Sequence, residues 1–182
     1  MLRINYIWAL LIVVALSSCE QGKYDREIEP PIEVVSGEAD FTNYVALGNS
    51  STAGLSDGAL FIASQDNSYP NLLAQKMALS GGGEFTQPYM NDNTGGLLWN
   101  GTQIPGPFGP RLFFNGAGLG TLPGPPTTDV TNIQPGPFNN MGVPGARSFH
   151  LLAPGYGNIA NLQLGLANPY FVRMASNPNA SV

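Results

Sequence analysis

The sequence predicts an α/β fold with a parallel sheet, and three observations support this class. A short apolar run, Tyr44–Leu47, is typical of a buried parallel strand, and it stops at Gly48. Asn67–Leu79 is the strongest helix candidate, with Pro70 near its first turn, where proline is tolerated. The order strand, long connection, strand and helix along the chain is compatible with an α/β domain.

The predicted strand leads into a turn that can hold a nucleophile, Gly48-Asn49-Ser50-Ser51-Thr52-Ala53-Gly54. The strand fixes the backbone, and the turn lifts Ser50 Oγ above the sheet edge, where turn amides can face a developing oxyanion. The same composition is also common in ordinary turns. The residues alone therefore leave a catalytic and a purely structural interpretation open.

Two blocks of the sequence resemble the SGNH, or GDSL, hydrolases over roughly residues 41–179. Residues 48–54 are similar to the family's first block, Gly-Asp-Ser-x-Thr-x-Gly, except that Asn49 stands where most members have Asp and so brings no charge to the turn. The stretches 57–59 and 67–74 are also similar to the residues that come after this block in the family. Phe138–Ala146 resembles the second block, in which a strand ends in Asn-x-Gly-x-x-Gly, and the matching oxyanion glycine is Gly145.

This resemblance implies a three-layer α/β/α domain with a parallel sheet, of which residues 41–182 form the N-terminal part. It also implies acyl transfer without a cofactor or metal. Ser50 attacks an ester carbonyl, the amides of Ser50 and Gly145 hold the oxyanion, and Asn49 supports the turn. The expected substrate is a lipid ester or an acylated glycan.

The family pattern further needs a Gly-x-Asn-Asp block and a late Asp-x-x-His, and neither occurs in these 182 residues. The only histidine is His150, on a predicted helix between apolar neighbours, which favours packing or a surface position over catalysis. We therefore expect an N-terminal fragment that does not turn over substrate alone. Its incomplete sheet should expose an apolar edge and lower the stability.

Residues 1–19 are predicted to be a bacterial lipoprotein signal peptide. Arg3 precedes an apolar region, Tyr6–Leu16, that is shorter than the roughly 20 residues of a transmembrane helix. The sequence Leu16-Ser17-Ser18-Cys19 resembles a lipobox, which implies acylation of Cys19 and a lipid anchor in the cell envelope, with the outer membrane as the expected site. The alternative is a plain secretory signal with an incidental cysteine. Cys19 is the only cysteine, so no disulfide can form within the chain.

The charge lies mostly in one segment. Residues 20–40 hold seven acidic residues against Lys23 and Arg26, so we expect an extended or disordered tether there. Residues 41–182 hold five acidic and four basic residues, although the whole chain has a net charge of −5. This nearly neutral part shows no basic patch in its sequence, so we do not expect nucleic acid to be a partner.

Residues 84–137 are rich in glycine, proline and aromatic residues, and they predict a long, ordered, loop-rich insertion. Contact of its rings with carbohydrate or acyl chains and simple packing onto the body both stay open. The alternative function is accordingly that of a non-catalytic surface lipoprotein that binds a glycan or another ligand through this insertion. We also expect helical pieces at residues 146–152 and 159–166, and an apolar core stripe on the first helix at Leu72, Leu73, Met77 and Leu79.

Overall fold

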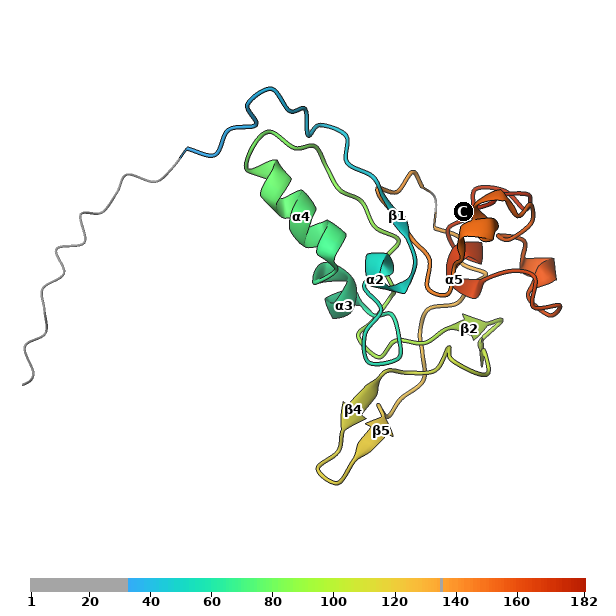
Figure 1. The fold of residues 1–182 in the computed structure, drawn as a ribbon. Helices are drawn as coiled ribbons and strands as arrows, with labels where there is room; N and C mark the ends of the chain where they lie inside the picture. Colours follow the sequence, from blue (N-terminus) through green and yellow to red (C-terminus); the bar gives the residue numbers. More distant parts are fainter. Residues whose placement is uncertain (1–32, 135) are drawn as a thin grey trace, which may run out of the picture. The chain divides into compact units, whose positions relative to one another are not determined.

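The computed structural model describes residues 33–134 and 136–182 (Figure 1). The α-helices of this part are α2 (Ser50–Ala53), α3 (Ile62–Asp66), α4 (Tyr69–Ala78) and α5 (Pro169–Val172). The strands are β1 (Ala46–Gly48), β2 (Leu98–Trp99), β3 (Thr102–Gln103), β4 (Leu112–Phe114), β5 (Leu119–Thr121) and β6 (Asn140–Gly142). Two 3-10 helices follow β6, η1 (Ser148–Leu152) and η2 (Ile159–Asn161). The fold is therefore mixed α/β.

A two-stranded parallel sheet joins β1 to β6, with Gly48 opposite Gly142. Helix α2 packs against both strands. A Cβ on Gly142 would lie 2.6 Å from the carbonyl carbon of Thr52, and one on Gly48 would clash with the Thr52 side chain. The two glycines therefore let α2 approach the sheet closely.

The prediction of a strand before Gly48 is confirmed, but its expected burial is correct for one face only. Ala46 is buried on the face that α2 covers, whereas Val45 is 62% and Leu47 is 55% exposed. Successive side chains of a strand point to opposite faces. Helix α2 covers the face of Ala46, so Val45 and Leu47, on the other face, stay exposed. Leu47 borders an open pocket instead of a second layer.

Helix α4 is confirmed where the sequence places a helix, with Pro70 in its first turn. The prediction of an apolar core stripe was wrong, because Leu72, Leu73 and Leu79 are exposed and Met77 is only partly buried. The helix contacts α2 and α3, and its buried residues are Pro70 and Ala74. Small side chains on that face let the helix approach its neighbours, so the leucines point outward.

Residues 84–137, which lacked a clear periodicity, hold two antiparallel hairpins. Asn100 and Gly101 connect β2 to β3 with φ values of 49° and 77°, as a two-residue type I′ turn requires. In the loop between β4 and β5, Asn115 Oδ1 accepts hydrogen bonds from the N–H groups of Ala117 and Gly118, each at 2.9 Å. The β4–β5 hairpin projects from the rest of the described chain (Figure 1).

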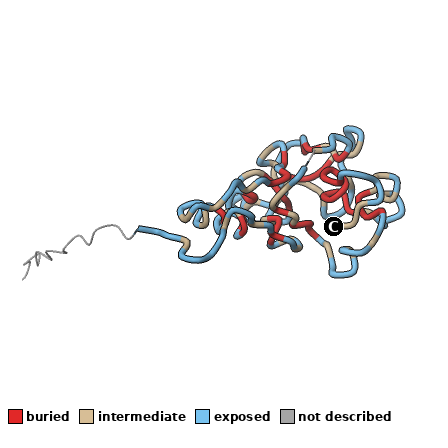
Figure 2. The backbone as a smooth tube through the Cα atoms, turned by 90° about the horizontal axis from the view of Figure 1, so that it is seen from above, coloured by how far each residue is buried: buried red, intermediate tan, exposed pale blue. Residues whose placement is uncertain are grey.

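The hydrophobic core lies between this insertion and the C-terminal segment. Leu97 and Val130 of the insertion are fully buried, together with Val143 after β6 and Phe171 of α5. The segment 168–175 is buried along its whole length. Figure 2 shows that buried and exposed stretches alternate along the described backbone. Burying each large apolar side chain contributes about 1.5–3 kcal/mol, so the insertion supplies a substantial share of the stability. The predicted helical pieces at 146–152 and 159–166 are the shorter 3-10 helices η1 and η2.

Candidate functional site

The parallel pair brings the two motif blocks to the same edge of the sheet. Because β1 and β6 run in the same direction and in register, Asn49-Ser50 and Pro144-Gly145 leave the carboxyl ends of adjacent strands. The N–H of Val143 donates to the carbonyl of Gly48 at 2.9 Å, which extends the pairing beyond the strands. About ninety residues lie between the two blocks in the sequence, and the pairing of β1 with β6 brings them together.

Ser50 is the first residue of α2, and it is half-buried. Its carbonyl accepts hydrogen bonds from the N–H groups of Gly54 at 3.1 Å and Leu55 at 2.9 Å, which fixes its backbone. Gly54 closes the turn with a φ of +86°. Within the described residues, Ser50 Oγ makes no hydrogen bond, so its hydroxyl is uncommitted.

Asn49 supports the turn through its backbone. Its carbonyl accepts the N–H of Ala53 at 2.9 Å, while its side chain makes no capping hydrogen bond. Without a carboxylate at this position, the turn carries no fixed negative charge beside Ser50.

A buried asparagine ties the two blocks together. Asn140 is 2% exposed, and its Nδ2 donates to the carbonyl of Thr52 at 3.0 Å and to Gln87 Oε1 at 2.9 Å. Its Oδ1 accepts the N–H of Gly142 at 3.0 Å. The side chain therefore positions α2 on β6. It is the asparagine of the Asn-x-Gly-x-x-Gly pattern, so the sequence held a signal for this residue, although the motif alone did not indicate its role.

Gly145 lies in an exposed turn with a φ of +81°, a conformation that favours glycine. The preceding carbonyl, that of Pro144, accepts a hydrogen bond from Asn168 Nδ2 at 2.8 Å, which holds the turn. The N–H of Gly145 has no acceptor within the described residues, and the N–H of Ser50, at the start of a helix, has no intrahelical partner. Both amides are therefore available as donors.

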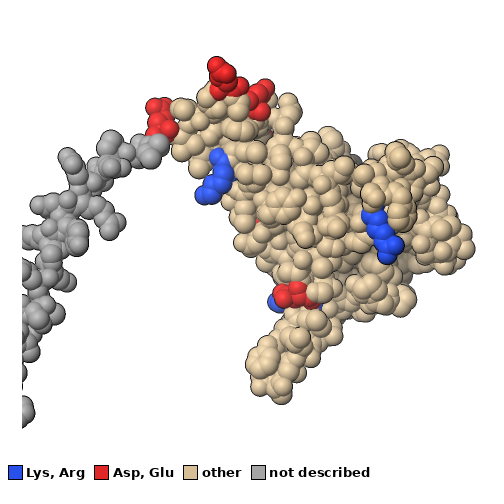
Figure 3. Space-filling view, in the orientation of Figure 1, with Lys and Arg blue, Asp and Glu red and all other residues tan. Residues whose placement is uncertain are grey.

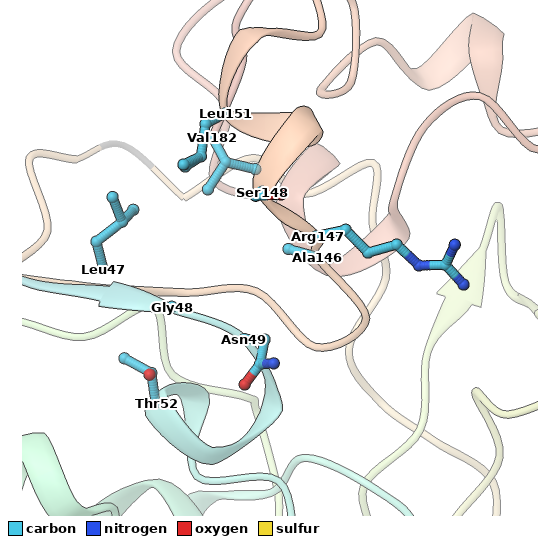
Figure 4. Close-up of a pocket in the computed structure, with 9 residues that line it drawn as sticks. All are labelled: Leu47, Gly48, Asn49, Thr52, Ala146, Arg147, Ser148, Leu151 and Val182. Carbon is cyan, nitrogen blue, oxygen red and sulfur yellow. The ribbon is translucent and has the colours of Figure 1, made fainter.

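A pocket of about 360 Å³ adjoins the end of β1. Figure 4 shows Leu47 on one side of it, facing Leu151 and Val182 on the other. Asn49 also lines it, whereas Ser50 and Gly145 are not among its wall residues. Arg147 is the one charged residue among the described residues of the wall, and its side chain points away from the pocket (Figure 4). The pocket therefore offers apolar and uncharged polar contacts.

His150 is occupied elsewhere. Its Nδ1 accepts the N–H of Arg147 at 3.0 Å, so the backbone of the same turn engages this ring nitrogen. The imidazole stacks on Tyr156, with 4.1 Å between ring centroids, and meets Phe149 edge-on at 4.1 Å. Burial raises the pKa of Tyr156, so this phenol stays neutral at neutral pH. Within the described residues no hydrogen bond joins His150 to Ser50, in agreement with the predicted packing or surface position.

The predicted lipidation site, Cys19, and the signal peptide lie outside the described residues. Among residues 33–134 and 136–182, no group of acidic residues and histidine is arranged to hold a metal ion. None of the helices in that part is long and apolar enough to cross a membrane. On the face seen in Figure 3, the few Lys and Arg side chains do not gather into a patch.

Comparisons of the chain with protein-family models, curated proteins and solved structures found no match. The relation to SGNH hydrolases therefore stays a prediction that rests on the two motif blocks.

Proposed function

We propose that Ser50 is the nucleophile of an SGNH-type serine ester hydrolase, and that the amides of Ser50 and Gly145 bind the oxyanion. In this proposal the enzyme is built on a three-layer α/β/α domain. One observation supports this most. Two segments that resemble the family's blocks leave adjacent parallel strands at one edge, beside a pocket. In open α/β sheets, ligands bind outside the carboxyl ends of the strands.

In the proposed reaction, Ser50 Oγ attacks the carbonyl carbon of an ester, and a base takes the hydroxyl proton. The resulting oxyanion accepts hydrogen bonds from the amides of Ser50 and Gly145. Its collapse expels the alcohol, which receives the proton, and water then hydrolyses the acyl-enzyme with help from the same base. Because His150 is held by Arg147 and Tyr156, we assign the role of the base to a group other than His150.

The proposal includes the cellular setting. Acylation of Cys19 would anchor the protein to a bacterial envelope membrane, with the outer membrane as our expected site, through residues 20–40. Two or three acyl chains give stable anchoring, whereas one chain gives marginal binding. A lipid ester or an acylated envelope glycan would then be within reach.

The test compares Ser50→Ala with Ser51→Ala in the protein expressed from its complete reading frame. We expect Ser50→Ala to lower kcat for short-chain esters by at least about a thousandfold and to abolish fluorophosphonate labelling, because it removes the attacking atom. Ser51 is exposed and one residue farther along α2, so Ser51→Ala is the matched control and should keep both. Loss of turnover in Ser51→Ala alone would contradict the assignment, and absence of labelling in both variants and in the parent would refute the hydrolase.

A further inference from the structure

A second pocket, of about 460 Å³, lies between the insertion and the C-terminal segment. Trp99, Ile104 and Phe108 line it from the insertion, and Leu162, Gln163 and Pro169 line it from the other side. Its volume falls in the range of about 300–1,000 Å³ that is typical of small-molecule sites. It shares no lining residue with the pocket beside β1.

The hydrogen bonds around this pocket fix its walls. The N–H of Leu97 donates to the carbonyl of Phe108 at 2.8 Å, and the N–H of Ile104 donates to the carbonyl of Leu97 at 2.9 Å. The Phe108 ring lies against Tyr170 of α5, with 5.7 Å between centroids. On the opposite wall, Asn168 Oδ1 accepts the N–H of Tyr170 at 2.9 Å at the start of α5. A ligand would therefore meet a largely preformed surface, which lowers the entropic cost of binding.

The chemistry of the lining selects the class of ligand. Among the described residues, no charged side chain lines the pocket, which disfavours an ionic ligand. Two of its lining residues carry polar side-chain groups, the Trp99 indole N–H and the Gln163 amide, and neither side chain makes a hydrogen bond within the described residues. An acyl chain has no group that could hydrogen-bond with either of them, so its binding would leave them without a partner. A sugar ring offers apolar C–H faces to Trp99 and Phe108 together with hydroxyls that pair with both polar groups.

We propose that this pocket binds an uncharged sugar unit of a glycan. The inference does not rest on the proposed ester hydrolysis, because binding here needs no turnover at Ser50. If both hold, the pocket identifies the substrate class as an acylated neutral glycan.

The experiment uses intrinsic fluorescence. The chain has two tryptophans, Trp8 and Trp99, so the full chain with Trp8→Phe reports on the pocket alone. The probes are uncharged hexasaccharides from cellulose, xylan, mannan and chitin, titrated to about 10 mM in a detergent without a sugar headgroup. We expect at least one of them to shift the Trp99 emission in a saturable way. Saturation-transfer NMR on the sugar C–H protons should confirm the contact without relying on tryptophan.

Gln163→Ala tests the polar contact, and Gln75→Ala on the exposed side of α4 is the matched control. Both side chains are exposed, so both variants should fold. We expect Gln163→Ala to weaken binding about threefold to tenfold, the loss of one hydrogen bond, while Gln75→Ala leaves it unchanged. The inference is overturned if none of the hexasaccharides binds at about 10 mM, or if binding is insensitive to Gln163→Ala. It is equally overturned if decanoic acid competes fully with the sugar, since that outcome assigns the pocket to an acyl chain.

Discussion

At the scale of single residues, the candidate site depends on glycines where side chains would collide. Gly142 is buried under α2, and a Cβ there would also meet the backbone N of Ala53. We expect Gly142→Ala to destabilise the fold by roughly 2 kcal/mol, because backbone atoms cannot yield as a flexible side chain can. Gly118 has no atom within 4 Å of its Cβ position, so Gly118→Ala is the control. Urea unfolding measures both, and equal stabilities would contradict the close packing of α2 on β6.

Arg173 is a second residue on which the fold depends, and it is 1% exposed. Its guanidinium donates to the carbonyl of Tyr89 at 2.9 Å, to Gln134 Oε1 at 3.3 Å and to the carbonyl of Pro88. Burial lowers its pKa to about 10, so it remains charged at neutral pH. It therefore joins α5 to the insertion by charge-assisted hydrogen bonds.

We expect Arg173→Ala to lower the free energy of unfolding by about 3 kcal/mol, because it removes charge-assisted hydrogen bonds to the carbonyls of Pro88 and Tyr89 and leaves a cavity where the buried side chain was. Arg147→Ala removes an exposed guanidinium and should change the free energy of unfolding by no more than about 0.5 kcal/mol. Thermal and urea unfolding of the two variants make the comparison. Similar losses in both would show that the buried hydrogen bonds of Arg173 contribute little.

The sequence identified candidate functional residues better than it identified residues whose role depends on distant contacts. Ser50 and Gly145 stand out through short motifs, and the structure places both at the carboxyl ends of β1 and β6. Arg173 and Asn140 could not be assigned in this way, because their partners lie far away in the chain, 84 residues from Tyr89 for Arg173 and 88 from Thr52 for Asn140. Only the fold brings such partners together.

At the scale of elements, helix α4 and strand β1 were predicted well and the insertion poorly. Asn100-Gly101 is the strongest short sequence signal for a hairpin, but it is flanked by strands of two residues each, too short for any alternation to be visible. The outward leucines of α4 show a related limit. Periodicity identifies residues that share a face, whereas tertiary contacts decide which face is buried.

Asp129 holds the β2–β3 hairpin to the body and gives it a pH dependence. Its Oδ2 accepts the N–H of Gly101 at 2.7 Å, and its Oδ1 accepts the N–H of Thr131 at 2.9 Å. Partial burial alone would raise the pKa of Asp129, but these hydrogen bonds outweigh it and lower the pKa below its ordinary value of 3.8. The carboxylate therefore stabilises the folded state above pH 3.8, and this contribution is lost as the pH falls through the lower folded-state pKa.

We expect Asp129→Asn to be less stable than the parent at neutral pH, with the difference shrinking as the pH falls below about 3.8. Asp57 is exposed and its side chain accepts no hydrogen bond within the described residues, so Asp57→Asn is the control and should show no such convergence. The measurement is the free energy of unfolding in urea across this pH range. A constant difference between parent and Asp129→Asn would rule out the proposed role of the carboxylate.

At the scale of the whole molecule, the sheet has an open side. The Ala46 N–H and Gly48 carbonyl bond to the β6 segment, so the backbone groups of Leu47 point to the opposite edge of β1, where no described strand lies. Val45 and Leu47 are also mostly exposed. The sequence predicted an exposed apolar edge because it offers too few strands for a full sheet, and the described residues agree with that expectation.

An unpaired strand edge with apolar side chains favours association with other chains. We expect the 182-residue protein to associate in a concentration-dependent way, and Leu47→Lys to reduce this, since a charged side chain on an edge opposes strand pairing. The melting temperature should stay nearly unchanged, because Leu47 is 55% exposed. Leu166 is 63% exposed in the loop between η2 and α5 and is not part of β1, so Leu166→Lys adds the same charge without altering the edge strand. Sedimentation velocity at several concentrations separates the two variants, and equal reduction of association by both would trace the effect to net charge instead of the β1 edge.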